Sequence, residues 1–247
     1  MKNAKPCDTP ASSDSKSIQE TAQEKEYPYR EAVGSLLYLS TRTRPDIAQA
    51  VNLVSRKVEN PTREDVTKVK KIFKYLVGTK HKGILFKRNK PIESIDAYSD
   101  SDYAGDPLTR RSTSGSVLMI ADGPISWASK RQPIVALSST EAEYIAAADC
   151  CKEALYLKSL LQEITGLDIK INLHVDNQSS IQLMKSGSFN KRSKHIDVRY
   201  HFIHEHFVHG LINISYCPTE IQLADVMTKP LSKVKFERHC ARLMHNI

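Results

Sequence analysis

Two aspartates stand at the ends of predicted strands, where a folded chain could bring their side chains together. Asp100 ends a strand in the motif YSDSD, and Asp176 ends another in INLHVD. By alternation, Asp100 falls on the polar side of its strand, opposite Ile95 and Ala97. The carboxyl ends of strands can meet at one edge of a sheet, where α/β proteins often hold their sites. We therefore expect the two carboxylates to converge there.

Glu143 is a third carboxylate, and its position in a predicted helix over residues 140–163 is unusual. It occupies the first turn of the stripe that faces the core, ahead of Ala146, Ala147, Cys150, Ala154, Leu157 and Leu161. A buried carboxylate is costly unless it is paired or bound to a metal ion. Neighbouring Glu141 has a simpler explanation, because it reaches back to the cap in a capping box that begins at Ser138. For Glu143, the same box moved to Thr140 remains the alternative.

Asp225 is the fourth carboxylate, in LADVMTKP on a short helix predicted over residues 222–228. An aspartate on a helix is usually just solvated, so it gains meaning only from the other three. Clustered carboxylates bind hard cations such as Mg²⁺ and Mn²⁺ through oxygen. Two such ions, roughly 3.5–4 Å apart, can stabilise the attacking and leaving oxygens of phosphodiester cleavage. The four residues together indicate metal-dependent cleavage of nucleic acid.

Five histidines between residues 195 and 209 raise zinc as an alternative metal. The chain contains neither HExxH nor HxxEH, and it contains no CxxC. We therefore expect these histidines to lie on a mixed helix surface, where partial protonation near pH 6.5 would add positive charge.

Hydrophobic periodicity divides the remaining chain into two regions with different structure. Residues 27–90 favour helices, because apolar residues recur at helical spacing and Pro45 and Pro61 stand where new helices begin. Later residues predict strands over 93–99, 114–121, 125–129, 170–176 and 211–217, and helices over 140–163, 178–185, 195–209 and 222–228. The resulting order, β-β-β-α-β-α-α-β-α, indicates an α/β fold with a mixed sheet covered by helices.

The positive charge of the chain is concentrated in one region. Residues 27–92 hold 15 basic and 5 acidic side chains, whereas residues 1–26 and 93–247 each carry a net charge of −1. Such a basic patch suits a polyanion such as nucleic acid, with a solvated helix surface as the alternative. The expected contacts with nucleic acid are Lys68, Lys71, Lys74, Arg110, Arg111, Lys191, Arg192 and Lys194.

Composition narrows the class of protein further. Apolar residues make up 40% and charged residues 26%, which is ordinary for a globular chain. No apolar run reaches the roughly 18–20 residues that a membrane span needs, and the first residues do not resemble a signal peptide. Five cysteines without a CxxC motif fit a reducing compartment. We expect an intracellular protein without a membrane partner, in the cytoplasm, with the nucleus as an alternative.

At this level of detail the residues resemble a known family. YSDSDYAGD, RRSTSG, WASKRQPIVALSSTEAEYIAA, HVDNQSSI, KRSKHIDVRYHFIHE and LADVMTKPL, in this order, are similar to the ribonuclease H domain of copia-type retrotransposon Pol polyproteins. Residues 29–79 resemble the thumb and connection that join the reverse transcriptase to that domain. The resemblance covers about residues 27–231 and implies a five-stranded mixed sheet with helices on both faces.

The resemblance also implies a site, a substrate and a cofactor. It assigns metal binding to Asp100, Glu143, Asp176 and Asp225, which are all intact. It implies hydrolysis of the RNA strand of an RNA–DNA hybrid with two Mg²⁺ ions, for which Mn²⁺ can substitute. The 2′-hydroxyls would distinguish RNA from DNA. The loop before Asp225 lacks the histidine of cellular members, so we expect slow turnover.

These observations predict a leader or linker over residues 1–26, a helical thumb-like segment over 27–92, a ribonuclease H-like domain over 93–232 and a tail over 233–247. No polymerase motif precedes the thumb-like segment, so we expect no polymerisation. A separate reverse transcriptase polymerase domain is an expected partner. The alternative function is a non-catalytic nucleic-acid-binding remnant of a Pol polyprotein. An integrase-type strand transferase shares this type of fold but is disfavoured by the upstream segment and the Asp-Glu-Asp-Asp order.

Overall fold

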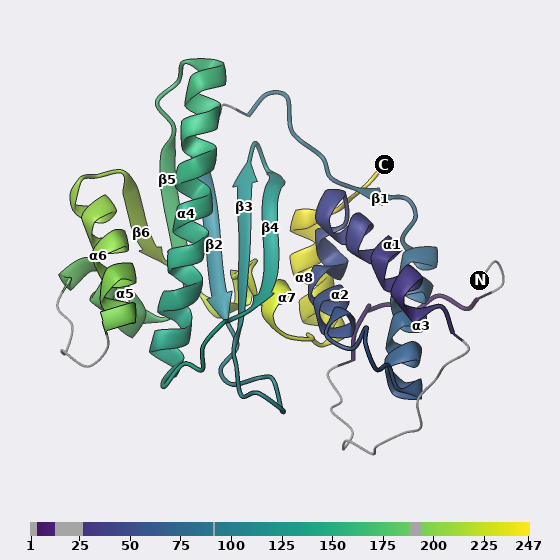
Figure 1. Cartoon of the computed structure of the whole chain (residues 1–247). Helices are drawn as coiled ribbons and strands as arrows, with labels where there is room; N and C mark the ends of the chain where they lie inside the picture. Colours follow the sequence, from purple (N-terminus) through teal and green to yellow (C-terminus); the bar gives the residue numbers. More distant parts are fainter. Residues whose placement is uncertain (1–3, 13–26, 91, 188–193) are drawn as a thin grey trace. The chain divides into compact units, whose positions relative to one another are not determined.

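The computed structural model describes residues 4–12, 27–90, 92–187 and 194–247, apart from the side chains of residues 194–200. The chain forms two compact units (Figure 1). The first comprises residues 1–85 and 229–247, and the second comprises residues 86–228. No described helix has the length and the apolar character needed to cross a membrane.

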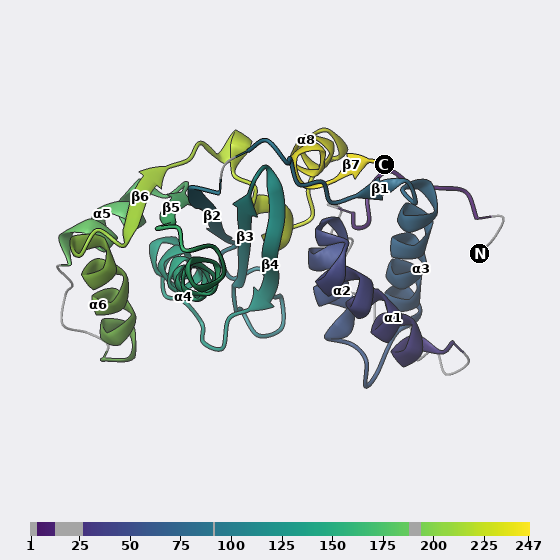
Figure 2. The ribbon, with the colours of Figure 1, turned by 90° about the horizontal axis from the view of Figure 1, so that it is seen from above.

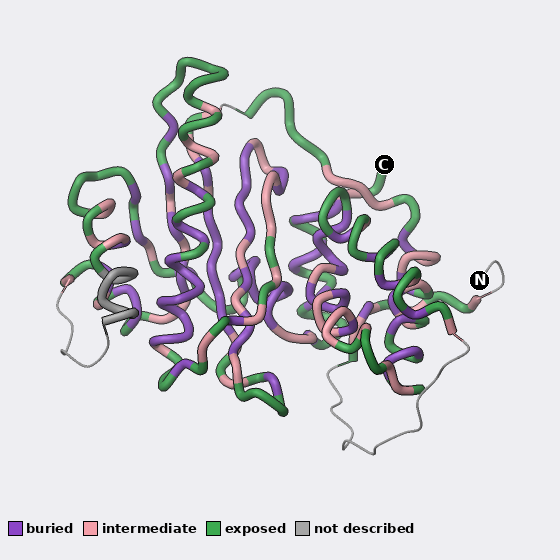
Figure 3. Tube along the Cα trace, viewed as in Figure 1, coloured by how far each residue is buried: buried purple, intermediate pink, exposed green. Residues whose placement is uncertain are grey.

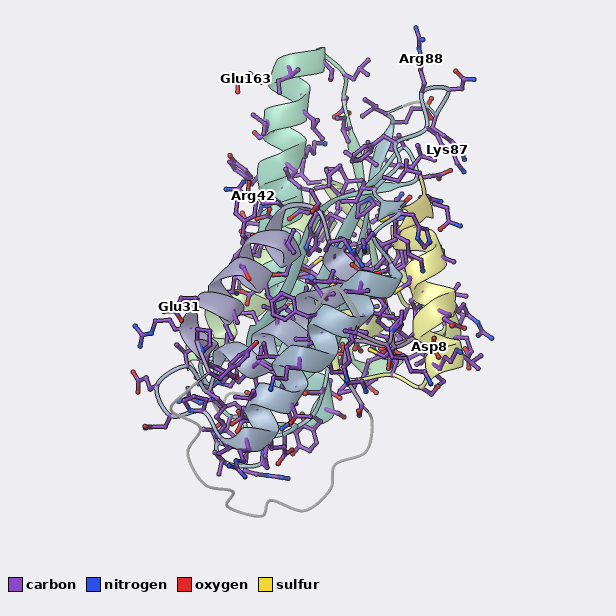
Figure 4. The ribbon with its side chains drawn as sticks, turned by 90° about the vertical axis from the view of Figure 1, so that its right-hand side faces the viewer. Asp8, Glu31, Arg42, Lys87, Arg88 and Glu163 are labelled. Carbon is purple, nitrogen blue, oxygen red and sulfur yellow. The ribbon has the colours of Figure 1, made fainter. Side chains whose placement is uncertain are left out.

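The first unit is built mainly from helices. They are α1 (Tyr29–Arg42), the 3₁₀ helix η1 (Pro45–Ile47), α2 (Ala48–Ser55), α3 (Arg63–Gly78) and α8 (Lys233–Leu243). Strands β1 (Lys82–Gly83) and β7 (His245–Asn246) pair antiparallel. In α1, Val33 and Leu36 are buried, while Glu31 and Arg42 are exposed and point away from the helix in Figure 4. This amphipathic pattern is what the sequence predicts for residues 27–90.

Helix α3 separates an apolar face from a basic one. Thr62 caps its N-terminus, and its side chain forms a capping box with Asp65. Val66, Val69 and Ile72 are buried at helical spacing. The lysines therefore fall on the other faces of the helix, as their positions in the sequence indicate.

The C-terminal residues differ from the expected tail. Residues 233–247 contain α8 and β7, and they belong to the same unit as α1–α3. Phe236 and Cys240 are buried, and the Phe236 ring meets Tyr75 of α3 edge-on at 5.6 Å between ring centroids. The helix gains its stability from residues more than 150 positions away in the sequence, so local periodicity alone did not predict it.

A buried polar network joins η1 to α3. The Arg44 guanidinium donates to both carboxylate oxygens of Asp46, at 2.9 and 2.7 Å, and to Thr79 Oγ1 at 2.6 Å. The Tyr75 hydroxyl donates to Asp46 Oδ2 at 2.6 Å. Burial raises the pKa of Tyr75 far above its usual value, and the Asp46 charge adds to this. Tyr75 therefore keeps its proton and its role as a donor.

The second unit contains a five-stranded sheet in the order β4-β3-β2-β5-β6. Its strands are β2 (Ser94–Ser101), β3 (Thr113–Ile120), β4 (Gly123–Arg131), β5 (Lys170–Val175) and β6 (Ile212–Tyr216). Strands β2, β3 and β4 pair antiparallel, whereas β2, β5 and β6 run parallel. The mixed sheet is the one that the sequence predicts.

Helices cover both faces of this sheet. The helices are α4 (Ser139–Thr165), α5 (Gln178–Ser186), α6 (Lys194–Val208), η2 (Thr219–Ile221) and α7 (Asp225–Thr228). Figure 2 shows α4, α5 and α6 on one face and the segment that leads into α7 on the other. The element order is the predicted β-β-β-α-β-α-α-β-α. The predicted fold class is therefore confirmed.

The main core lies between the sheet and α4. Figure 3 shows β2 and much of α4 as buried. Ile95 and Leu173 of the sheet pack in one cluster with Ala147 and Ala154 of α4. Small side chains on α4 allow the helix to approach the sheet closely, and Gly166 ends the helix with φ 71°. This packing fixes the first turns of α4 above the end of β2.

Candidate metal centre

Three carboxylates come together at one edge of the sheet in the second unit. Asp100 lies near the end of β2, Glu143 lies in the first turns of α4, and Asp176 directly follows β5. One carboxylate oxygen of each lies within 4.8 Å of one oxygen of each of the others. Asp100 and Glu143 are only 2% and 6% exposed, and Asp176 is half-buried.

The parallel pairing of β2 with β5 explains why the two aspartates meet. The register aligns Ser99 with Val175, so that the next residues, Asp100 and Asp176, leave the pair together. Thr219 Oγ1 donates to Asp176 Oδ2 at 2.9 Å and orients this carboxylate. The convergence that alternation and strand order predict is therefore present, while the catalytic role of these residues stays a prediction.

Asp100 is more buried than its expected place on a polar face suggests. Helix α7 covers this end of the sheet, and Thr228 Oγ1 donates to Asp100 Oδ2 at 2.5 Å. Gly115 pairs with Asp100 across β2 and β3. A Cβ atom on Gly115 would lie 2.7 Å from the Thr228 methyl and 2.8 Å from the Ala224 carbonyl. Because Gly115 has no side chain, α7 packs closely on β3 and shields the Asp100 carboxylate from water.

Glu143 points toward the sheet and not toward the helix cap. Its Oε1 accepts from the Ser101 N–H at 3.2 Å, so the alternative of a box moved to Thr140 is wrong. Ser138 caps the helix by accepting from the Glu141 N–H at 3.1 Å. Glu141 accepts from the Leu137 N–H at 2.8 Å, one residue before the cap, and so departs slightly from the expected capping box. Glu141 therefore contributes to the start of the helix, whereas Glu143 contacts the end of β2.

Asp225 is not a member of the group of three. It is the first residue of α7 and is 1% exposed. Its carboxylate does not belong to the set whose oxygens lie within 4.8 Å of one another. The sequence predicts a helix over residues 222–228. In the structure the helix covers only Asp225–Thr228, and a turn precedes it. The structure therefore brings three of the four expected ligands together.

The three residues fit a hard divalent cation. All of their ligand atoms are carboxylate oxygens, which Mg²⁺ and Mn²⁺ prefer, whereas zinc favours histidine and cysteine. Two of the carboxylates are buried, and buried like charges at this distance need a compensating positive charge. Within the described part of the chain, no histidine belongs to a metal-binding group. His204 and His206 instead contact backbone carbonyls of Met184 and Phe202.

The loop between β2 and β3 presents the expected arginines beside this edge. Asp106 organises the loop by accepting from the Leu108 and Thr109 N–H groups, at 3.1 and 2.9 Å, and from Arg131 at 3.0 Å. Burial alone would raise the pKa of Asp106, but the Thr109 and Arg131 hydrogen bonds outweigh it and lower this pKa well below its usual range. Arg110 is exposed with φ 53°, and Arg111 is half-buried.

The expected lysine contacts differ in how available they are. Lys68 contacts Glu64 at 2.8 Å and Asp65 at 3.7 Å, so its charge is partly neutralised. Lys71 donates to Ser12, and Lys74 is exposed. Lys191 and Arg192 lie outside the described residues, as does the side chain of Lys194 at the start of α6.

The strand order and the acidic sheet edge define the class of protein. Three antiparallel strands followed by two parallel ones, with α4 crossing one face, form the ribonuclease H-like fold. A solved structure similar to this chain is RNase H1 from the halophilic archaeon Halobacterium salinarum NRC-1. It has 20% sequence identity and a TM-score of 0.41, and the match covers 55% of this chain and 94% of that one.

The amino-acid sequence is similar to part of two curated plant proteins. The chain is 42% identical over 245 residues to the retrovirus-related Pol polyprotein from transposon TNT 1-94 of Nicotiana tabacum, which covers 96% of this chain. It is 40% identical over 219 residues to the Pol polyprotein from transposon RE1 of Arabidopsis thaliana, covering 87%. The chain is similar to one segment of these retrovirus-related Pol polyproteins. It spans 18% and 15% of the length of these relatives. No family model matches it.

Proposed function

We propose that this chain is a metal-dependent endoribonuclease that cleaves the RNA strand of RNA–DNA hybrids. The observation that carries the proposal is the group formed by Asp100, Glu143 and Asp176 on a ribonuclease H-like sheet. Similarity to retrovirus-related Pol polyproteins of transposons supports the choice of substrate, because reverse transcription produces such hybrids.

The three carboxylates would hold the metal ions, with Asp225 as the expected fourth ligand from α7. When bound, two Mg²⁺ ions, or Mn²⁺ in their place, would activate a water molecule and stabilise the leaving 3′ oxygen. The side chains of this chain supply orientation. Thr228 fixes one oxygen of Asp100, the Ser101 N–H fixes one oxygen of Glu143, and Thr219 fixes one oxygen of Asp176.

Substrate binding would depend on positive charge outside the carboxylate group. Arg110 and Arg111 stand on the loop that follows β2, and the first unit supplies Lys71 and Lys74. Phosphate contacts of this kind position a nucleic acid without reading its sequence. Recognition of 2′-hydroxyls would select the RNA strand. A reverse transcriptase polymerase domain is the proposed protein partner. The proposed location is intracellular, in the cytoplasm or a virus-like particle, with the nucleus as the alternative.

A second function, nucleic-acid binding without cleavage, is favoured by the distribution of charge. Residues 1–85 and 229–247 carry 21 basic and 11 acidic side chains, a net charge of +10, whereas residues 86–228 carry 15 and 17, a net charge of −2. The basic unit could therefore bind a polyanion without the carboxylate group.

The test compares end-labelled RNA–DNA hybrid, RNA duplex and DNA duplex as substrates for the purified full chain. We expect cleavage of the RNA in the hybrid with Mg²⁺ or Mn²⁺, none with EDTA, and none of either duplex. Salt-sensitive binding of the hybrid by a folded chain that never cuts it would support the binding function instead.

A further inference from the structure

Gln222 is a buried side chain that contacts the two strands that end beside the carboxylate group, β2 and β5. It is 0% exposed and lies three residues before Asp225. Its Nε2 donates to the Ser99 carbonyl at 3.1 Å and to the His174 carbonyl at 3.2 Å. Its Oε1 accepts from the Ala224 N–H at 3.3 Å. One amide group therefore joins β2, β5 and the segment that leads into α7.

These contacts fall next to the carboxylates themselves. Ser99 directly precedes Asp100, His174 lies two residues before Asp176, and Ala224 directly precedes Asp225. The β2–β5 pairing ends at Ser99 and Val175, so Gln222 crosses the two strands where their pairing stops. Any change in this bridge would be transmitted to the spacing between the carboxylates that follow it.

A role in filling space alone does not explain the choice of glutamine. A fully buried amide is costly unless its donors and acceptor are satisfied, and here the Nε2 group and Oε1 all find backbone partners. A methionine of similar size would fill the same volume without that requirement. The hydrogen bonds therefore hold β2, β5 and the segment before α7 in fixed positions, which an apolar side chain could not do.

We propose that Gln222 is a positioning residue that sets the separation of the Asp100 and Asp176 carboxylates and thereby the affinity for divalent metal. The inference rests on the proposed metal-dependent function. It assigns no direct contact with the metal to Gln222. Groups that orient metal ligands from outside the coordination sphere commonly change metal affinity by about 10–100-fold when they are removed.

The test measures Mn²⁺ binding to the full chain by isothermal titration calorimetry, and thermal unfolding in EDTA. Gln222→Met removes all three hydrogen bonds and keeps the volume. Gln222→Asn keeps an amide that is one methylene too short to reach both carbonyls. Ile212→Ala is the matched control, because it removes buried volume at the start of β6, beside the end of β5 that is far from the carboxylate group.

We expect Gln222→Met to bind Mn²⁺ about 10–100-fold more weakly than the wild type, Gln222→Asn to lie between them, and Ile212→Ala to bind like the wild type although it unfolds earlier. Wild-type affinity in a folded Gln222→Met chain would overturn the inference and leave the proposed function standing. If neither Gln222 variant folded, the positioning role would be overturned, and Gln222 would have a role in stability alone. A wild-type chain that binds no Mn²⁺ would overturn the proposed function together with this inference.

Discussion

Asp100 takes its orientation from Thr228, a residue that the sequence did not single out. The hydroxyl donates to Asp100 Oδ2 and also contacts the Asp225 carbonyl at 3.2 Å. The motif LADVMTKP contains both residues, but only the packing of α7 on β2 shows that the threonine faces the aspartate. In the sequence, a threonine three residues after an aspartate looks the same whether its hydroxyl is solvated or binds another residue.

Thr228→Val tests this contact at the residue scale. The variant keeps the shape of the side chain and removes the donor to Asp100. We expect the rate of hybrid cleavage to fall about 10-fold or more, because a partner that orients a metal ligand is lost. Cleavage kinetics at saturating Mg²⁺ measure the effect, and Thr228→Ser, which keeps the hydroxyl, should retain most of the activity. Equal rates for all three chains would contradict the role of the hydroxyl.

Asp106 gives a second prediction at this scale, in which pH is the variable. Its folded pKa is lowered, so its contribution to stability is fully present above the unfolded value of about 3.9 and is lost as the pH falls through the folded pKa. The free energy of unfolding of Asp106→Asn should therefore be about 1.5–3 kcal/mol lower than that of the wild type at pH 7, where the wild type keeps its charged hydrogen bonds.

Urea unfolding at several pH values measures this difference. The gap between wild type and Asp106→Asn should narrow as the pH falls below about 4, because the Asp106 carboxyl takes up a proton in the unfolded chain while it stays charged in the folded one. Asp149→Asn is the control, since Asp149 is exposed on α4. A gap that stays constant down to pH 2 would show that the charge of Asp106 is not responsible.

At the scale of elements, the approach of α7 to the sheet depends on one glycine. A Cβ on Gly115 would come within 2.8 Å of the Met227 Cβ and the Ala224 carbonyl. Gly115→Ala should push α7 away from β3 and cost about 1–3 kcal/mol of unfolding free energy, as overpacking does. Because α7 carries Thr228, cleavage should fall as well.

Unfolding in denaturant and cleavage of the hybrid measure these two effects of Gly115→Ala. Gly34→Ala is a suitable control, because nothing lies within 4 Å of the position where its Cβ would be. If Gly115→Ala matched the control in both stability and cleavage, the close contact between α7 and β3 would be wrong.

Most elements of this chain follow from local sequence, and the exceptions share a cause. Strands β2 and β5 and helix α4 have clear periodicity, and the caps at Ser138 and Gly166 mark the ends of the helix. Helix α8 and the strand pair β1–β7 depend on segments far apart in the chain. The burial of Asp100 depends on α7 in the same way. Periodicity reports what a segment could bury, but not which distant segment covers it.

The carboxylate group shows the same limit at the level of single side chains. The sequence placed Asp100, Glu143 and Asp176 at strand ends and on a core-facing stripe, and the structure brings them together. Asp225 gained meaning only from the other three carboxylates and from family resemblance, and its carboxylate is not part of the group of three. The bridging contacts of Gln222 and Thr228 could not be predicted from the sequence, because each joins residues more than 40 positions apart.

At the scale of the whole molecule, the division of charge predicts how binding responds to salt. The first unit carries a net charge of +10, while the carboxylate group lies in a unit of net charge −2. Hybrid affinity should therefore fall steeply between 50 and 200 mM NaCl through the release of counterions. Fluorescence anisotropy with a labelled hybrid in EDTA measures binding without cleavage.

Two lysines of α3 sharpen this prediction. Lys74→Gln should reduce the slope of log affinity against log salt by about one, the expected effect of one lost phosphate contact. Lys68→Gln should change the slope less, because Glu64 and Asp65 already offset the charge of Lys68. If the slope of log affinity against log salt were near zero for the wild type, the positive charge of the first unit would not contribute to hybrid binding.

We propose that Asp100, Glu143 and Asp176 perform metal-dependent cleavage of RNA in a hybrid. The most direct measurement is the cleavage rate of a 5′-labelled RNA–DNA hybrid by wild type, Asp176→Asn and the control Asp149→Asn, in Mg²⁺ and in EDTA. We predict cleavage by the wild type and the control in Mg²⁺ only, and a loss of at least about 100-fold in folded Asp176→Asn that still binds the hybrid. Cleavage by Asp176→Asn at the wild-type rate, or by the wild type in EDTA, would show that these carboxylates do not act through a metal ion.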